Sequence, residues 1–257
     1  MPSRPSPVRL LTVLVLALLA SGCADGHGGE VPGSASDAVD CSGSPYRTGS
    51  GNYDSGPEDV RDDARGALDD WLEQEGWSLP DVEWAEAARQ GDEALFTWSS
   101  AGSVLAAFVV RDGTDGLDDH RGWGVASYAV CDPADWPPDK SDEIGVEVWT
   151  NADGDRVPTS LIQSFRGPEH CGWEETTFLF LGKDGEDGLF YGTPDPDFDR
   201  FLRTTYAAHA EPPGDAEDTG YRRDGRELWV TPDAAYLVAA DGDAERWPAP
   251  EQPIYCD

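Results

Sequence analysis

The spacing of apolar and polar residues predicts a helix followed by strands in the first half of the chain. Ser55 and Glu58 have the spacing of a capping box, and Gly76 follows the last apolar position. The apolar side chains of this helix fall on one face: Val60, Ala64, Ala67, Leu68, Trp71 and Leu72. Strand-like runs come next, at residues 82–87, 95–99, 104–110 and 123–130, joined by short turns such as Ala101-Gly102. The run 104–110 is apolar on both faces, so we expect it to be a central strand under the helix.

The pattern of the second half of the chain predicts mostly strands. They are expected at residues 144–150, 157–165, 176–181, 227–231, 235–239 and 245–247. A short helix is expected where apolar residues recur at helical spacing from Phe198 to Tyr206. Pro133, Pro137 and Pro138 cannot continue a sheet and are expected to join the two halves. The predicted class is α+β: a helix over an antiparallel meander in residues 57–138, then a β-rich subdomain in residues 139–257.

The first 22 residues have the pattern of an export signal. Arg4 and Arg9 precede an apolar run at residues 10–19, which is too short to span a bilayer as a permanent helix. The small residues before Cys23 resemble a bacterial lipobox, in which that cysteine receives a lipid and becomes the new N-terminus. Ala20 stands where the lipobox usually has Leu, Val or Ile, so cleavage by the ordinary signal peptidase is the alternative.

The cysteine count favours the lipoprotein interpretation. If Cys23 carries the lipid, Cys41, Cys131, Cys171 and Cys256 remain as an even set for two disulfides in an oxidising compartment. Three pairings are open; we favour Cys41 with Cys131 and Cys171 with Cys256, because each bond then lies within one predicted half. Residues 23–56 are rich in Gly and Ser and are expected to form the lipid anchor and a flexible tether.

The charge of the chain limits its partners. It carries 51 Asp and Glu against 18 Lys and Arg, a formal net charge of −33. So negative a surface repels phosphate backbones, which excludes nucleic acid as a partner. The expected location is the extracytoplasmic face of the cell membrane, with the lipid on Cys23 as the membrane contact and a cell-wall glycan or another envelope protein as a possible further partner.

Three short motifs carry a family resemblance. They are His170-Cys171-Gly172-Trp173, the stretch from Thr219 to Val230 and Glu245-Arg246-Trp247-Pro248. Together with Cys256, they resemble the C-terminal half of uncharacterised secreted or lipid-anchored actinobacterial proteins, over residues 144–257. The resemblance implies an envelope location and adds no catalytic residue, so the mechanism stays open.

Motifs of catalysis or metal binding are not found in the sequence. Asn151, Asp153 and Asp155 alternate as in a calcium loop, but Ile162 stands where the loop needs its last carboxylate. No catalytic residue, metal or cofactor is therefore predicted. The alternative is a secreted hydrolase whose site assembles from scattered acids with His120 or His170.

Two tryptophans suggest a ligand-binding surface. Strand alternation places Trp149 beside Glu147 and Trp229 beside Glu227, on the faces opposite the neighbouring aliphatic residues. Such a surface could stack sugar rings, although the same residues would also fill an interface between subdomains. The sequence therefore predicts a lipid-anchored binding or structural module of the cell envelope, with Trp149 and Trp229 as candidate ligand contacts.

Overall fold

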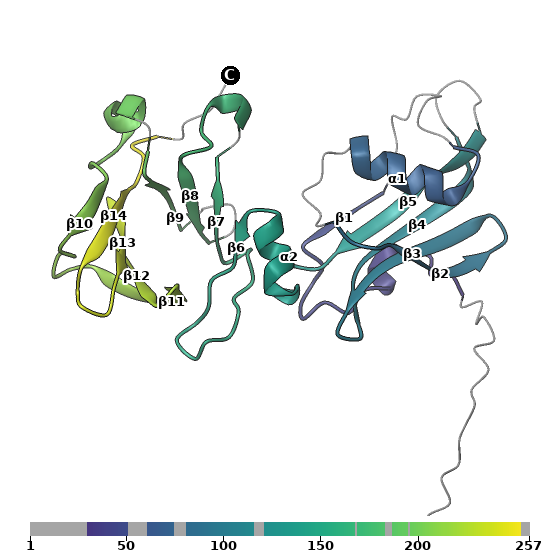
Figure 1. Cartoon of the computed structure of the whole chain (residues 1–257), viewed down its shortest axis with the longest axis horizontal. Helices are drawn as coiled ribbons and strands as arrows, with labels where there is room; N and C mark the ends of the chain where they lie inside the picture. The colour runs from purple at the N-terminus through teal and green to yellow at the C-terminus, as the bar shows by residue number, and fades with distance from the viewer. Residues whose placement is uncertain are drawn as a thin grey trace, which may run out of the picture.

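A computed structural model describes residues 30–50, 61–74, 81–115, 121–167, 169–182, 187–194 and 196–252. This part of the chain is mostly β, with three antiparallel sheets and two short helices (Figure 1). The helical content is lower than the predicted α+β class implies. Neither of the described helices is long and apolar enough to cross a membrane.

The first sheet contains the predicted meander. Its strands are β1 (Arg47–Gly49), β2 (Ala85–Gln90), β3 (Glu93–Ser100), β4 (Ser103–Asp115) and β5 (Arg121–Val130), in the order β1-β5-β4-β3-β2. The turn between β3 and β4 places Ala101 and Gly102 at φ values of 52° and 90°. Positive φ at both central residues is typical of the tight turns that match strand twist, which confirms the expected turn.

Helix α1 (Ala64–Gln74) covers one face of this sheet. Its buried residues are Ala64, Ala67, Leu68 and Trp71, as the apolar spacing predicts. The Trp71 ring meets Phe108 of β4 edge-on, with ring centroids 5.1 Å apart. The predicted capping residues Ser55 and Glu58, and the terminating Gly76, lie outside the described residues.

The opposite face of the first sheet is covered by the N-terminal segment, residues 30–40. Val31 is 6% exposed and Ala35 is fully buried against Ala107, Val109 and Ala129. The backbone N–H of Ala35, in the 3-10 turn Ala35–Asp37, donates to Ser127 Oγ at 3.0 Å. The tether interpretation is therefore wrong for residues 30–50. A segment too polar to build a core of its own still packs when a strand such as β4 offers an apolar second face.

The proline-rich joint follows β5. It contains a 3-10 turn at Pro133–Asp135 and helix α2 (Pro138–Glu143), and prolines occupy the first positions of both. Proline is tolerated there because the first N–H groups of a helix have no partner within it. Figure 1 shows α2 between the first sheet and the remaining strands.

Two further sheets pack face to face in the second half. The four-stranded sheet contains β6 (Val146–Glu147), β7 (Ile162–Arg166), β8 (Thr177–Leu181) and β9 (Gly188–Gly192) in sequential order. The five-stranded sheet has the order β10-β14-β13-β12-β11, with β10 (Ala207–Ala210), β11 (Glu217–Arg223), β12 (Arg226–Val230), β13 (Ala234–Val238) and β14 (Ala244–Pro248). Trp149, Ile162, Leu179, Leu228 and Leu237 form the core between them.

Several predictions for this half needed correction. The run 144–150 forms only the two-residue β6, while β9, β10 and β11 were not predicted. The expected helix around Phe198 is a 3-10 helix, Pro196–Phe201, and a further 3-10 turn lies at Glu169–Cys171. The strands β9 and β11 contain glycine, and β10 consists of three alanines and one histidine. Because glycine and alanine are poor strand formers, pairing with neighbouring strands rather than intrinsic propensity decides the conformation of these three strands.

Candidate functional site

The two tryptophans predicted as ligand contacts do not form one surface. Trp149 has no exposed surface and lies in the core with Leu228 of β12. Trp229, the next residue on that strand, packs on the opposite face of the sheet with Tyr236. Successive strand residues point to opposite faces, so the pair is separated by the sheet itself. The sugar-stacking surface predicted from Trp149 and Trp229 is therefore wrong.

Trp149 instead belongs to a partly buried polar cluster that connects β6, β7 and β11. Ser164 Oγ donates to Glu147 Oε2 at 2.5 Å and accepts from Arg223 Nη1 at 2.6 Å and Trp149 Nε1 at 3.2 Å. Arg223 also pairs with Glu147, and its guanidinium lies 5.3 Å from the Trp149 ring. Ser164 has no exposed surface, so its hydroxyl cannot reach a substrate. The cluster stabilises the contact between the two sheets.

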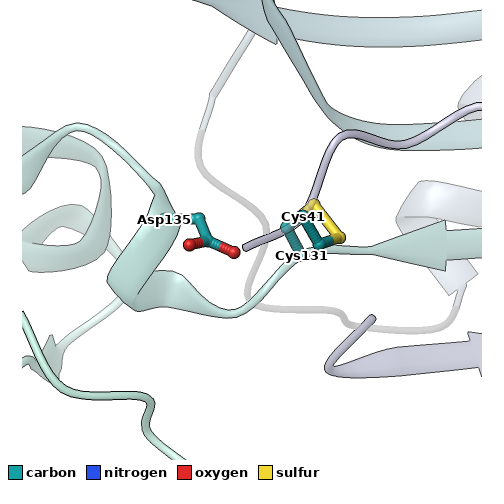
Figure 2. Close-up of side chains that lie close together, drawn as sticks. All are labelled: Cys41, Cys131 and Asp135. Carbon is teal, nitrogen blue, oxygen red and sulfur yellow. A yellow bond between two sulfur atoms is a disulfide. The ribbon is translucent and has the colours of Figure 1, made fainter. Parts of the chain in front are cut away.

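The predicted disulfide between Cys41 and Cys131 is confirmed (Figure 2). Their Cα atoms are 5.1 Å apart, within the range that a disulfide needs. Cys171 is also disulfide-bonded, whereas Cys256 and the lipidation candidate Cys23 lie outside the described residues. The pairing of Cys171 with Cys256 therefore stays a prediction.

Asp135 lies beside the Cys41–Cys131 disulfide, and the three side chains are close enough together to suggest a metal site (Figure 2). Both sulfur atoms are committed to the disulfide, and only a thiolate binds metal well. One Oδ of Asp135 accepts from the Ser42 backbone N–H at 3.2 Å, which fixes the chain next to the disulfide. Asp135 and the disulfide therefore have a structural role, in which they hold the segment around Cys41 against the joint.

The histidines do not assemble an acid–base site in the described residues. His120 lies outside them, and His170 is exposed in the 3-10 turn Glu169–Cys171. His209 Nδ1 is 2.7 Å from Asp243 Oδ2, but that pair is exposed and lines none of the hollows described here. The hydrolase alternative gains no support from this geometry.

The most enclosed of three hollows in the described part of the chain is a cleft of about 380 Å³ between the first sheet and the four-stranded sheet, hereafter the intersheet cleft. Its volume is that of a small-ligand pocket. The first sheet and the joint contribute Tyr46, Arg47, Val130, Pro133, Trp136 and Ile144. The second half contributes Gly145, Val146, Gln163, Phe165, Arg166 and Phe180. Two other hollows, of about 540 and 570 Å³, are more open to solvent and are lined in part by acidic residues.

Strand register explains why apolar side chains reach the intersheet cleft. Val146 pairs with Phe165, and Gln163 pairs with Phe180, so all four residues lie on one face of the four-stranded sheet. The other face carries residues such as Ile162 and Leu179, which are fully buried against the five-stranded sheet. One face thus builds the core between the sheets. On the second face, Phe178 and Tyr191 pack in a cluster of their own, and the four residues named above line the cleft.

The walls of the intersheet cleft are held together by hydrogen bonds across the joint. Arg156 donates to the carbonyls of Trp136 and Pro133, at 2.5 and 3.1 Å, and to Ser141 Oγ at 2.8 Å. Burial lowers the pKa of Arg156 from its ordinary value, because a desolvated guanidinium is less stable as a cation. Asp132, which is 8% exposed, accepts from the N–H and the hydroxyl of Thr159. These bonds fix the distance between the two walls.

The intersheet cleft differs in charge from the chain as a whole. About one residue in five is acidic, yet among the described residues that line the cleft there is no Asp or Glu. Two arginines are present, Arg47 and Arg166. The Arg47 guanidinium lies 5.6 Å from the Tyr46 ring centroid, within the range of a cation–π contact.

The sequence alone does not reveal the intersheet cleft. Its residues come from several segments between Tyr46 and Phe180, and no local spacing brings them together. The one available signal was β8, where Phe178 and Phe180 alternate with Leu179 and Leu181. A strand that is apolar on both faces has something to contact on each side.

Comparison of the chain with protein-family models, with curated proteins and with solved structures finds no match. The resemblance to secreted actinobacterial proteins therefore stays a prediction.

Proposed function

We propose that this chain is a lipid-anchored binding module on the extracytoplasmic face of the cell membrane, and that its ligand occupies the intersheet cleft. The lining of the cleft carries this proposal. Aromatic and aliphatic side chains supply most of it, with a few polar groups at defined positions, which is the composition of ligand pockets in general.

The same lining supports binding over hydrolysis. General acid–base catalysis needs a side chain that exchanges a proton near neutral pH, and nucleophilic catalysis needs an activated hydroxyl, thiol or carboxylate. Among the described residues that line the cleft there is no Asp, Glu, His, Ser or Cys. A sugar-rich glycan is also a poor fit, because Gln163 is the only uncharged hydrogen-bonding side chain there besides the Tyr46 hydroxyl and the Trp136 indole.

A neutral fluorescent probe tests the occupancy of the cleft. N-phenyl-1-naphthylamine should bind the wild-type protein with one site, and Gln163→Trp should weaken that binding about tenfold or more by filling the cleft. Gln90→Trp places the same side chain on the exposed edge strand β2 and should leave binding unchanged. Failure of the wild-type protein to bind the probe, or equal binding by Gln163→Trp, would reject the cleft as the binding site.

The membrane anchor needs a separate experiment. Cys23→Ser should release the protein from the membrane fraction or block its processing, because the lipid would be attached through the Cys23 sulfur. Metabolic labelling with a radioactive fatty acid measures the modification directly. A wild-type protein without label would contradict the lipid anchor while leaving the cleft proposal intact.

A further inference from the structure

We infer that the intersheet cleft binds an amphipathic anion: a carboxylate, phosphate or sulfonate group attached to an apolar body. This inference rests on the proposed binding function and adds the chemical class of the ligand. Arg47 and Arg166 would contact the anionic group, and the aromatic residues of the cleft would cover the apolar body.

The position of the arginines is the first support. Arg47 pairs with Val130 across β1 and β5, so both lie on the same face of the first sheet, and both line the cleft. Arg166 is the last residue of β7 and lines the cleft from the opposite wall. Both arginines are exposed, so a ligand entering from solvent can reach them. An anionic group held between the walls would therefore have one of these two arginines on each side.

Arg166 also has no counter-ion among the residues that the structure describes. It makes no hydrogen bond or ion pair with another side chain in the described part of the protein. Other arginines are paired: Arg222 with Asp218, Arg226 with Glu245, and Arg111 with Glu93. In a chain with 51 acidic residues, a cation without a carboxylate partner in a cleft without acids is complementary to an anion from outside.

Aromatic packing defines the other part of the ligand. Phe165 and Phe180 pack edge-to-face, with ring centroids 5.2 Å apart, and both are only half-buried. Val146 and Ile144 extend the same apolar wall and are also half-buried. Exposed apolar surface of this kind is stabilised when a ligand removes it from water. An inorganic anion alone would leave that surface exposed.

The net charge of the protein affects how fast such a ligand approaches more than how tightly it binds once in the cleft. A net charge of −33 repels anions at long range, but at about 0.15 M salt charges are screened beyond about 8 Å. The two arginines act at contact distance, where screening is weak. The preference for an anionic ligand therefore comes from the two arginines in the cleft and not from the net charge of the protein.

Two dyes with the same rings provide the test. 8-Anilinonaphthalene-1-sulfonate is N-phenyl-1-naphthylamine with an added sulfonate, so their ratio of dissociation constants reports the anionic group alone. The wild-type protein should bind the sulfonate about tenfold more tightly, the ratio expected from one charge-assisted hydrogen bond. Arg166→Gln and Arg47→Gln should each reduce this preference without weakening the neutral dye.

Matched variants separate the cleft from the rest of the surface. Gln163→Glu adds a carboxylate to the lining with almost no change in shape and should reverse the preference. Arg200→Gln removes a guanidinium that contacts Phe201 outside the cleft, and Gln90→Glu adds a charge on β2; neither should alter the ratio. Circular dichroism melting curves should show that each variant is folded.

Competition then identifies the source of the anion. Dodecanoate and dodecyl phosphate share a chain length with dodecanol, and each is titrated against the bound sulfonate dye. Displacement by one or both anions at concentrations where the alcohol does not compete supports the inference and distinguishes carboxylate from phosphate. Equal binding of both dyes, unchanged by the arginine variants, would overturn the anion inference but leave the binding proposal standing. Binding of neither dye would overturn both.

Discussion

Replacing Tyr191 with Phe should stabilise the protein, because the Tyr191 hydroxyl is buried without a partner. The residue is 1% exposed and packs against Phe178, with ring centroids 5.0 Å apart. Its hydroxyl oxygen has no hydrogen-bond partner among the described residues. Burial of an unsatisfied hydroxyl costs about 1–3 kcal/mol, and Phe has the same shape without it. We expect the free energy of unfolding to rise by about 1–2 kcal/mol at about pH 7.

The same hydroxyl should make the wild-type protein sensitive to alkali. Burial raises the pKa of Tyr191 to about 12 from its ordinary value of 10.0. Below the unfolded pKa both states hold the proton and nothing changes. Above it the unfolded state ionises first, so stability falls, by about 1.4 kcal/mol at about pH 11 and about 2.3 kcal/mol at about pH 12. Tyr191→Phe should lack this loss.

Urea unfolding followed by tryptophan fluorescence measures both effects. Curves at neutral pH and at about pH 11 are compared for wild type, Tyr191→Phe and a control, Tyr206→Phe, whose ring is only half-buried. The control should change neither the midpoint nor its pH dependence. A Tyr191→Phe protein that is less stable than wild type would show that the hydroxyl is hydrogen-bonded, and equal alkaline losses in both proteins would refute the assigned pKa.

Three other substitutions address the scaffold. Cys41→Ala with Cys131→Ala opens a loop of 90 residues and should lower the free energy of unfolding by about 2–5 kcal/mol in denaturant titration; no loss would mean that the disulfide is not formed. Arg156→Met removes three hydrogen bonds across the joint, so it should lower the free energy of unfolding by about 2–4 kcal/mol and weaken dye binding in the cleft. Unchanged dye binding would show that these hydrogen bonds do not shape the cleft. Trp149→Ala should cost about 3–5 kcal/mol by calorimetry, and a loss below about 1 kcal/mol would contradict its burial.

The sequence correctly predicted those parts of the fold that depend on residues close together in the chain. The apolar spacing that includes Ala64, Leu68 and Trp71 identified the buried face of α1, and the pair Ala101-Gly102 identified a tight turn. A second signal of the same kind was missed. Asp224-Gly225 is a typical hairpin pair, both residues have positive φ, and it joins β11 to β12.

Long-range contacts account for the failures. Ala35 lies in a polar segment, and only the apolar second face of the first sheet explains its burial. Glu147 shares the face of Trp149 and suggested that this face meets water. Ser164 and Arg223 instead bind the Glu147 carboxylate, and Trp149 is fully buried. Alternation along a strand separates two faces, but it does not say which of them meets water. The intersheet cleft could not be predicted for the same reason, because residues from distant segments form it.

The packed N-terminal segment restricts how the protein could sit on a membrane. Val31 is fixed against the first sheet and is eight residues from Cys23. Eight residues span at most about 26–29 Å when fully extended. A lipid on Cys23 would therefore hold the domain close to the bilayer through a short linker, which reaches the domain on the face opposite α1. Such a linker would not let the domain rotate freely above the bilayer. A protein anchored in this way would sample its proposed ligand within a shallow layer at the membrane surface, where amphipathic molecules accumulate.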